Sequence, residues 1–235
     1  MSLRKYIPNT ITCLSLFSGC VASVMAWEGD LWLALLWIVA AAVFDFCDGF
    51  AARLLKAYSP MGKELDSLSD VISFGFAPGV VVFHLLSDVA AALPLGTLNA
   101  YVPYWAFVIP VFSGLRLAKF NIDERQTSSF IGLPVPAHAL LWASAAYALE
   151  PLAAITNASV FTVVVMILAF ATSLLLVSEI PMFSLKVKSW AWKGNELRYI
   201  LVVCAVLFVA LWGCLGITAT ILLYIVLSIF NRRNR

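Results

Sequence analysis

Four aspartates stand close together in the sequence, in two pairs. Asp45 and Asp48 are three residues apart, and Asp66 and Asp70 are four residues apart. On an α-helix, residues three or four apart lie on one face, so each pair would present both carboxylates in one direction. Two antiparallel helices with a short connection would then bring all four to one place. Such oxygen ligands suit Mg²⁺, Mn²⁺ or Ca²⁺ rather than Zn²⁺.

The segment between the two pairs has residues that suit a phosphate group. Gly49, Ala52 and Gly62 remove side-chain bulk where a substrate must come close. Arg53 offers a planar set of donors that matches phosphate oxygens. Ser59 precedes a proline that breaks the chain between the two helices, and its hydroxyl is placed to reach a phosphate or a nucleotide.

A purely structural alternative is that the aspartates pair with Arg53, Lys56 and Lys63 in a salt-bridge network at the membrane surface. That reading would suit a single pair of aspartates. Four carboxylates at this spacing, with small residues between them, favour a metal and phosphate site instead.

The composition indicates that these residues sit on membrane helices. Of the 235 residues, 63% are hydrophobic and 12% are charged, whereas a soluble domain has about 25% charged residues. Since a span needs about 20 apolar residues, we predict an all-α, polytopic bundle of about eight transmembrane helices. The first is expected to be retained, because no small-residue cleavage site follows it cleanly. The predicted spans are Ile11–Trp27, Leu31–Leu54, Leu68–Leu86, Tyr101–Ala118, Phe130–Leu149, Leu152–Val177, Tyr199–Trp212 and Leu215–Phe230.

The positions of the basic residues support this count. If both termini are cytoplasmic and the spans alternate, all 15 Lys and Arg residues fall on the cytoplasmic side, as the positive-inside rule requires. Gly213 and Gly216 then separate the last two spans as a tight hairpin. The basic residues are Arg4, Lys5, Arg53, Lys56, Lys63, Arg116, Lys119, Arg125, Lys186, Lys188, Lys193, Arg198, Arg232, Arg233 and Arg235.

The spacing around the aspartates resembles the signature of the CDP-alcohol phosphatidyltransferases. The chain matches its eight fixed positions, which are Asp45, Asp48, Gly49, Ala52, Arg53, Gly62, Asp66 and Asp70. This resemblance implies an enzyme that exchanges the CMP of a CDP-linked lipid for an alcohol. It also implies one membrane domain over residues 1–235, with a six-helix core at 1–177 and a helical hairpin at 178–235.

The resemblance implies a role for each residue of the site. Asp45, Asp48 and Asp66 would bind one or two Mg²⁺ or Mn²⁺ ions. Asp70 would also face the metal and act as the base that deprotonates the acceptor hydroxyl. The residues implied at the CDP-lipid are Pro8, Asn9, Thr10, Asp45, Gly49, Arg53, Ser59 and Gly62. For Asn9, contact with a cytosine edge and a role as helix N-cap are both open.

Three further segments resemble the membrane-embedded phosphatidylserine synthases. They are Ser73–Pro78, Arg116–Asn121 and Phe130–Pro136. Arg116 would hold the carboxylate of L-serine in a fork, and Ser73 and Asn121 would add hydrogen bonds. The alternatives are that Arg116 extends to lipid phosphates, that Ser73 bonds its own helix, and that Gly132–Pro136 only breaks a helix start.

These readings predict CDP-diacylglycerol and L-serine as substrates and no nucleic acid partner. The protein is expected in the inner (cytoplasmic) membrane, as a homodimer with its active site facing the cytoplasm. One alternative keeps the reaction but uses glycerol 3-phosphate or inositol phosphate as acceptor, with Arg116, Lys119 and Arg125 as the basic cluster. Another is a cation transporter, which would place its carboxylates near the midplane between paired repeats.

Overall fold

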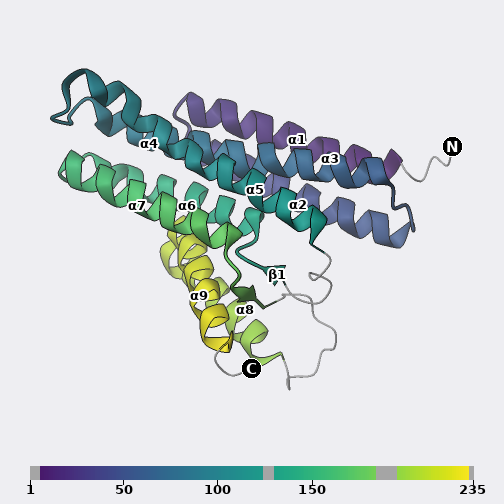
Figure 1. The fold of residues 1–235 in the computed structure, drawn as a ribbon. Helices are drawn as coiled ribbons and strands as arrows, with labels where there is room; N and C mark the ends of the chain where they lie inside the picture. Colours follow the sequence, from purple (N-terminus) through teal and green to yellow (C-terminus); the bar gives the residue numbers. More distant parts are fainter. Residues whose placement is uncertain (1–5, 124–129, 184–194, 233–235) are drawn as a thin grey trace.

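The computed structural model describes residues 6–123, 130–183 and 195–232. This part of the chain is helical, apart from connections and one two-residue strand pair (Figure 1). Its helices are α1 (Tyr6–Trp27), α2 (Leu31–Leu54), α3 (Pro60–Asp70), α4 (Ala77–Ala90), α5 (Val108–Ile122), α6 (Val135–Ala153), α7 (Ala158–Val177), α8 (Glu196–Trp212) and α9 (Cys214–Arg232). A π-helical stretch, Val71–Phe76, joins α3 to α4, and a 3₁₀ helix, Gly96–Phe107, leads into α5.

Five helical segments are long and apolar enough to cross a membrane, which supports the predicted membrane protein. They are Tyr6–Trp27, Leu31–Leu54, Pro60–Ala90, Gly96–Ile122 and Ala158–Val177. A sixth, Cys214–Phe230, is apolar but shorter. Figure 1 shows α8 and α9 as a pair inclined to the other helices. The count of eight spans and the cytoplasmic termini therefore stay predictions. Several basic residues used for them lie outside the described residues: Arg4, Lys5, Arg125, Lys186, Lys188, Lys193, Arg233 and Arg235.

Several helix boundaries differ from the predicted spans, because capping residues and prolines determine where the helices begin. The third helix begins at Pro60 rather than Leu68, because Ser59 caps it: the Gly62 amide donates to the Ser59 hydroxyl at 3.0 Å. The predicted break before Leu152 is also displaced. Helix α6 continues to Ala153, and α7 starts after Asn157, whose side chain accepts from two amides of its first turn.

A short β-ribbon replaces the expected start of the fifth span. Strand β1 (Phe130–Ile131) pairs antiparallel with β2 (Pro181–Met182), so α6 begins only at Val135. Gly132 has φ +77°, and its amide donates to the Ile180 carbonyl at 2.9 Å. The broken helix start expected at Gly132–Pro136 is thus confirmed, and the ribbon fastens it to the end of α7.

Helices α1 and α2 and the π-helical stretch that follows α3 pack through small residues and hydroxyl groups. The Ser73 hydroxyl donates to the Ser15 carbonyl at 3.0 Å, and the Ser15 hydroxyl donates to the Ala41 carbonyl at 3.0 Å. A Cβ on Gly19 would lie 2.4 Å from Ser73 Oγ, so only glycine fits there. In lipid, such close packing and hydrogen bonding hold helices together. This packing fixes the relative positions of the two aspartate pairs.

The expected hairpin between the last two helices is confirmed. Gly213 ends α8 with φ +58°, and α9 starts at the next residue. A Cβ on Gly216 would lie 2.3 Å from the Phe208 carbonyl oxygen, so the two helices approach closely at this point.

We predict that Gly132→Ala strongly destabilises the fold. The left-handed backbone costs an alanine about 1–2 kcal/mol, and the new Cβ would lie 2.3 Å from the Leu176 carbonyl oxygen. Thermal unfolding in detergent should therefore occur at a clearly lower temperature. Gly114→Ala is the matched control, because a Cβ there meets nothing within 4 Å. Equal unfolding temperatures for the two variants would contradict the prediction.

Candidate metal and phosphate site

The two aspartate pairs meet, as their spacing predicts. Asp45 and Asp48 lie in the last part of α2, and Asp66 lies on α3, which follows after a short turn. One carboxylate oxygen from each of these three residues lies within 4.8 Å of the others. Asp48 is only 6% exposed. Three like charges this close repel strongly outside bulk water, so the cluster requires a cation or protons.

Asp70 lies next to this cluster, at the end of α3. Its charge interacts with those of Asp45, Asp66 and Asp48. Its Oδ1 is buried and has no hydrogen-bond partner among the described residues. The π-helical stretch begins at the following residue, and such stretches are frequent at functional sites. The structure therefore brings all four aspartates to one region.

The aspartates do not form the salt-bridge network considered as an alternative. Within the described residues, the ion pairs join His84 to Asp88 and Lys119 to Glu179. Lys63 instead donates to the backbone carbonyl of Asn121 at 3.2 Å.

These carboxylates suit a divalent metal ion. Asp48 Oδ2 and Asp70 Oδ1 are buried and receive no hydrogen bond from the part of the chain that the structure describes. Burying a charged oxygen without a partner is costly, and a coordinated cation would remove that cost. The ligand set consists of oxygen atoms alone, which suits Mg²⁺, Mn²⁺ or Ca²⁺.

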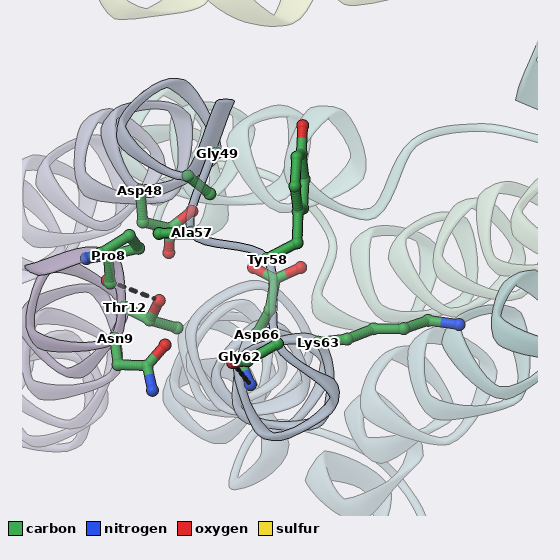
Figure 2. Close-up of a pocket in the computed structure, with 12 residues that line it drawn as sticks. Pro8, Asn9, Thr12, Asp48, Gly49, Ala57, Tyr58, Gly62, Lys63 and Asp66 are labelled. Atoms are coloured by element: carbon green, nitrogen blue, oxygen red, sulfur yellow. Dashed lines mark hydrogen bonds between the residues drawn. The ribbon is translucent and has the colours of Figure 1, made fainter. Parts of the chain in front are cut away.

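A cavity of about 220 Å³ opens beside the aspartates (Figure 2). Helix α1, the end of α2, the connecting turn and the start of α3 form its walls. Gly62 lines the cavity at a close contact, because a Cβ there would lie 3.0 Å from Asn9 Oδ1 and from Ser59 Oγ. The lining residues are Pro8, Asn9, Thr12, Asp48, Gly49, Ala52, Ala57, Tyr58, Ser59, Gly62, Lys63 and Asp66.

Most residues expected at the CDP-lipid line this cavity, but Asp45, Thr10 and Arg53 do not. Asp45 belongs to the neighbouring carboxylate cluster. Thr10 is exposed, and its hydroxyl donates to the Tyr6 carbonyl of its own helix at 2.8 Å. Arg53 is exposed beside the cavity: a Cβ on Gly49 would lie 3.6 Å from its Nη1. Asn9 lies inside α1, so its reading as an N-cap is wrong, and it faces the cavity. The Ser59 side chain caps α3 while it lines the cavity.

The structure adds four lining residues that the sequence reading missed: Thr12, Ala57, Tyr58 and Lys63. Thr12 follows Pro8 by four residues and so shares its helix face, and its hydroxyl donates to the Pro8 carbonyl at 3.1 Å. Tyr58 and Lys63 flank the cap of α3. The helical period, which puts Thr12 on the same face as Pro8, could have indicated Thr12. Nothing in the sequence pattern distinguished Tyr58 and Lys63.

The three residues expected at the acceptor have different surroundings. Arg116 is 7% exposed and its charge interacts with that of Asp70, so its reading as a group extended to lipid phosphates is wrong. The Asn121 side chain donates to Ser67 Oγ on α3 at 2.8 Å. Ser73 is fully buried, and its hydroxyl donates to the Ser15 carbonyl on α1, so the alternative in which it bonds its own helix is wrong. Its role at the acceptor stays a prediction.

Comparison with known sequences identifies the class of protein that carries this site. The family model for CDP-alcohol phosphatidyltransferase matches residues 5–175, and the chain belongs to this family. It is thus a transferase, as its signature predicted, and the transporter reading is set aside.

Within this family, the chain is similar to several proteins that share one name. The chain is 36% identical over 132 residues to CDP-diacylglycerol--serine O-phosphatidyltransferase of Bacillus subtilis, covering 56% of this chain and 70% of that protein. It is 36% identical over 145 residues to the Mycobacterium leprae protein of that name, and 34% over 136 residues to the Helicobacter pylori protein. These matches cover 58% and 57% of this chain, but only 45% and 54% of the two relatives, so the chain spans about half of their length.

Proposed function

We propose that the protein transfers the phosphatidyl group of CDP-diacylglycerol to the hydroxyl of L-serine, giving phosphatidylserine and CMP. The observation that carries this proposal is the aspartate cluster beside the cavity, together with the buried Arg116, whose charge interacts with that of Asp70. The names of the relatives support serine as acceptor. Arg116 supplies a guanidinium that suits its carboxylate. A phosphate acceptor would require more cations, and Lys119 is instead paired with Glu179. Arg125 lies outside the described residues.

Asp45, Asp48, Asp66 and Asp70 would hold one or two Mg²⁺ or Mn²⁺ ions. Bound metal would neutralise the diphosphate and the charge that develops on the departing CMP. The cavity between α1 and α3 would receive the CDP group, with Asn9 offering both donor and acceptor atoms to a base. Gly49 and Gly62 would leave room for the phosphates.

Asp70 would accept the proton of the serine hydroxyl. The serine oxygen then attacks the phosphatidyl phosphorus, and the bond between that phosphorus and the oxygen of CMP breaks. The charges of Asp70 and Arg116 interact, so a serine whose carboxylate binds Arg116 would bring its hydroxyl toward Asp70. General base catalysis needs only hydrogen-bond reach of that hydroxyl.

The location and assembly are part of the same proposal. The cavity lies at the end of the helices where Arg53, Lys56 and Lys63 gather, and the positive-inside rule places such an end in the cytoplasm. The enzyme would thus act at the cytoplasmic face of the inner membrane, as a homodimer. The core at residues 1–177 and the hairpin at 178–235 would form one membrane domain.

The test is CMP release by the purified protein in detergent with CDP-diacylglycerol and Mn²⁺ or Mg²⁺. We expect CMP release with L-serine and none with glycerol 3-phosphate, inositol phosphate or a metal chelator present. If CMP were released with glycerol 3-phosphate but not with L-serine, the reaction of the family would stand and serine as the acceptor would be rejected. Release independent of any divalent ion would reject the metal role of the aspartates.

A further inference from the structure

The end of α5 is tied to α3 by two hydrogen bonds that meet at one residue, Asn121. Its side-chain amide donates to Ser67 Oγ at 2.8 Å, and its backbone carbonyl accepts from Lys63 Nζ at 3.2 Å. The Ser67 hydroxyl donates to the Lys63 carbonyl of its own helix at 3.2 Å, so its oxygen acts as the acceptor for Asn121. The Asn121 carbonyl lies in the last turn of α5, where carbonyls lack partners within the helix and a lysine suits them.

The residues of α3 that hold Asn121 lie on the helix face that carries Asp70. Lys63, Ser67 and Asp70 are four and then three residues apart, so they share one face. Lys63 also lines the CDP cavity, and Figure 2 shows its side chain extending away from Asp48. Asp66 directly precedes Ser67. The two hydrogen bonds therefore act on the part of α3 that borders both the cavity and the carboxylate cluster.

A second contact sets the register of α5 along this face. A Cβ on Gly75 would lie 3.0 Å from Ser113 Cβ, where α5 packs on the π-helical stretch. Ser113 precedes Asn121 by eight residues. Gly75 follows Ser67 by the same number. The two segments thus run antiparallel between a close packing contact at one end and a side-chain hydrogen bond at the other.

Asp70 and Arg116 both lie inside this interval, one on each segment. Helix α5 is fixed independently on its other side, because Lys119 donates to the Val177 carbonyl at 3.3 Å and pairs with Glu179. Helix α5 is therefore the fixed partner, and the hydrogen bond at the end of the interval determines where α3 lies against it. The distance from Asp70 to Arg116 depends on that position.

We infer that Asn121 is a positioning residue, which acts through Ser67 to hold Asp70 in place opposite Arg116, rather than a ligand of the acceptor. This inference rests on the proposed function, in which a serine bound by Arg116 presents its hydroxyl to Asp70. Attack requires reacting atoms about 3–3.5 Å apart and aligned. A small shift of α3 would therefore slow the reaction, while Arg116 would still bind the serine carboxylate.

The test compares Asn121→Ala with Ser67→Ala, since these variants remove one hydrogen bond from its two sides. Both keep the backbone carbonyl that accepts from Lys63. We expect each to lower kcat for serine-dependent CMP release about tenfold, because a misplacement of about 1 Å costs up to about 10²-fold. The KM values for L-serine and CDP-diacylglycerol should stay unchanged, as for an interaction that matters only in the transition state. The double variant should be no slower than either single variant, because all three lack the same bond.

Two further variants separate this bond from the general loss of a helix hydroxyl. Ser67→Thr keeps a hydroxyl that can accept from Asn121 and should retain wild-type kcat. Ser87→Ala is the matched control, because Ser87 also donates to the carbonyl four residues earlier in its helix, at 2.8 Å, but lies on α4. It should also retain wild-type kcat.

The outcomes distinguish this inference from the function on which it rests. Wild-type protein without serine-dependent CMP release would reject both. If wild type shows that release and Ser67→Ala keeps wild-type kcat, only the role of Asn121 is rejected, even where the Tm falls. A higher serine KM in Asn121→Ala but not in Ser67→Ala would show direct contact with the acceptor and overturn the inference. A double variant whose loss of kcat equals the product of the two single losses would show independent roles and overturn it as well.

Discussion

Asp70→Asn should lower kcat for CMP release by about 10²- to 10⁴-fold, the usual contribution of a general base. An amide keeps the size of the side chain but cannot take the proton of the serine hydroxyl. The loss would matter at Asp70, because its charge interacts with those of Asp45, Asp48 and Asp66 and with that of the buried Arg116. Steady-state kinetics at saturating CDP-diacylglycerol, serine and Mn²⁺ provide the measurement.

Glu64→Gln is the control for this variant. Glu64 stands on the same helix, α3, but is exposed and does not belong to the cluster. It should keep wild-type kcat. If Asp70→Asn retained more than about a tenth of wild-type kcat, the assignment of Asp70 as base would be wrong, because the effect would lie below the range of general base catalysis.

Asp48→Asn should change thermal stability in opposite directions with and without metal. Without metal, the variant removes one of three carboxylates within 4.8 Å of one another, so repulsion falls and the Tm should rise. With Mn²⁺, wild type gains stability because the ion binds the folded state, and the variant should lose most of that gain. Thermal unfolding in detergent, with chelator or with millimolar Mn²⁺, tests both signs.

Asp88→Asn serves as the matched control, since Asp88 is an exposed partner of His84, away from the cluster. It should respond to Mn²⁺ as wild type does. A metal-dependent rise in Tm that is the same in Asp48→Asn and wild type would show that the ion binds elsewhere. A lower Tm of Asp48→Asn in chelator would show that this carboxylate is satisfied by the protein alone.

The sequence predicted the aspartate cluster because a helix repeats regularly. Intervals of three and four residues put Asp45 and Asp48, and likewise Asp66 and Asp70, on one helix face. The short connection between the two helices then brings the two pairs together. The apolar runs predicted the long helices for a similar reason, since bilayer thickness sets their length. Family motifs indicated Arg116, which the structure buries and whose charge interacts with that of Asp70.

The missed features depend on contacts between segments distant in the chain. Ser73 resembled a substrate ligand, but its partner is a carbonyl on α1, 58 residues away. The pairing of Phe130–Ile131 with Pro181–Met182 also joins distant segments, and each strand is too short to show a period of two. Tyr58 enters the cavity because of the turn that precedes α3, which single-sequence patterns do not resolve.

The π-helical stretch at Val71–Phe76 divides the long helical segment Pro60–Ala90 into two parts, α3 and α4. The side chains of the two parts do not follow one continuous helical repeat. An extra residue in one turn, seen where the Ala77 amide donates to the Ile72 carbonyl, rotates everything after it by about 100° relative to a regular helix. Helix α3 can therefore direct its aspartates at α2 while α4 directs a continuous apolar face at α1 and α6. A deletion of one residue here would still leave a helix, but either the carboxylates or the apolar face would point the wrong way.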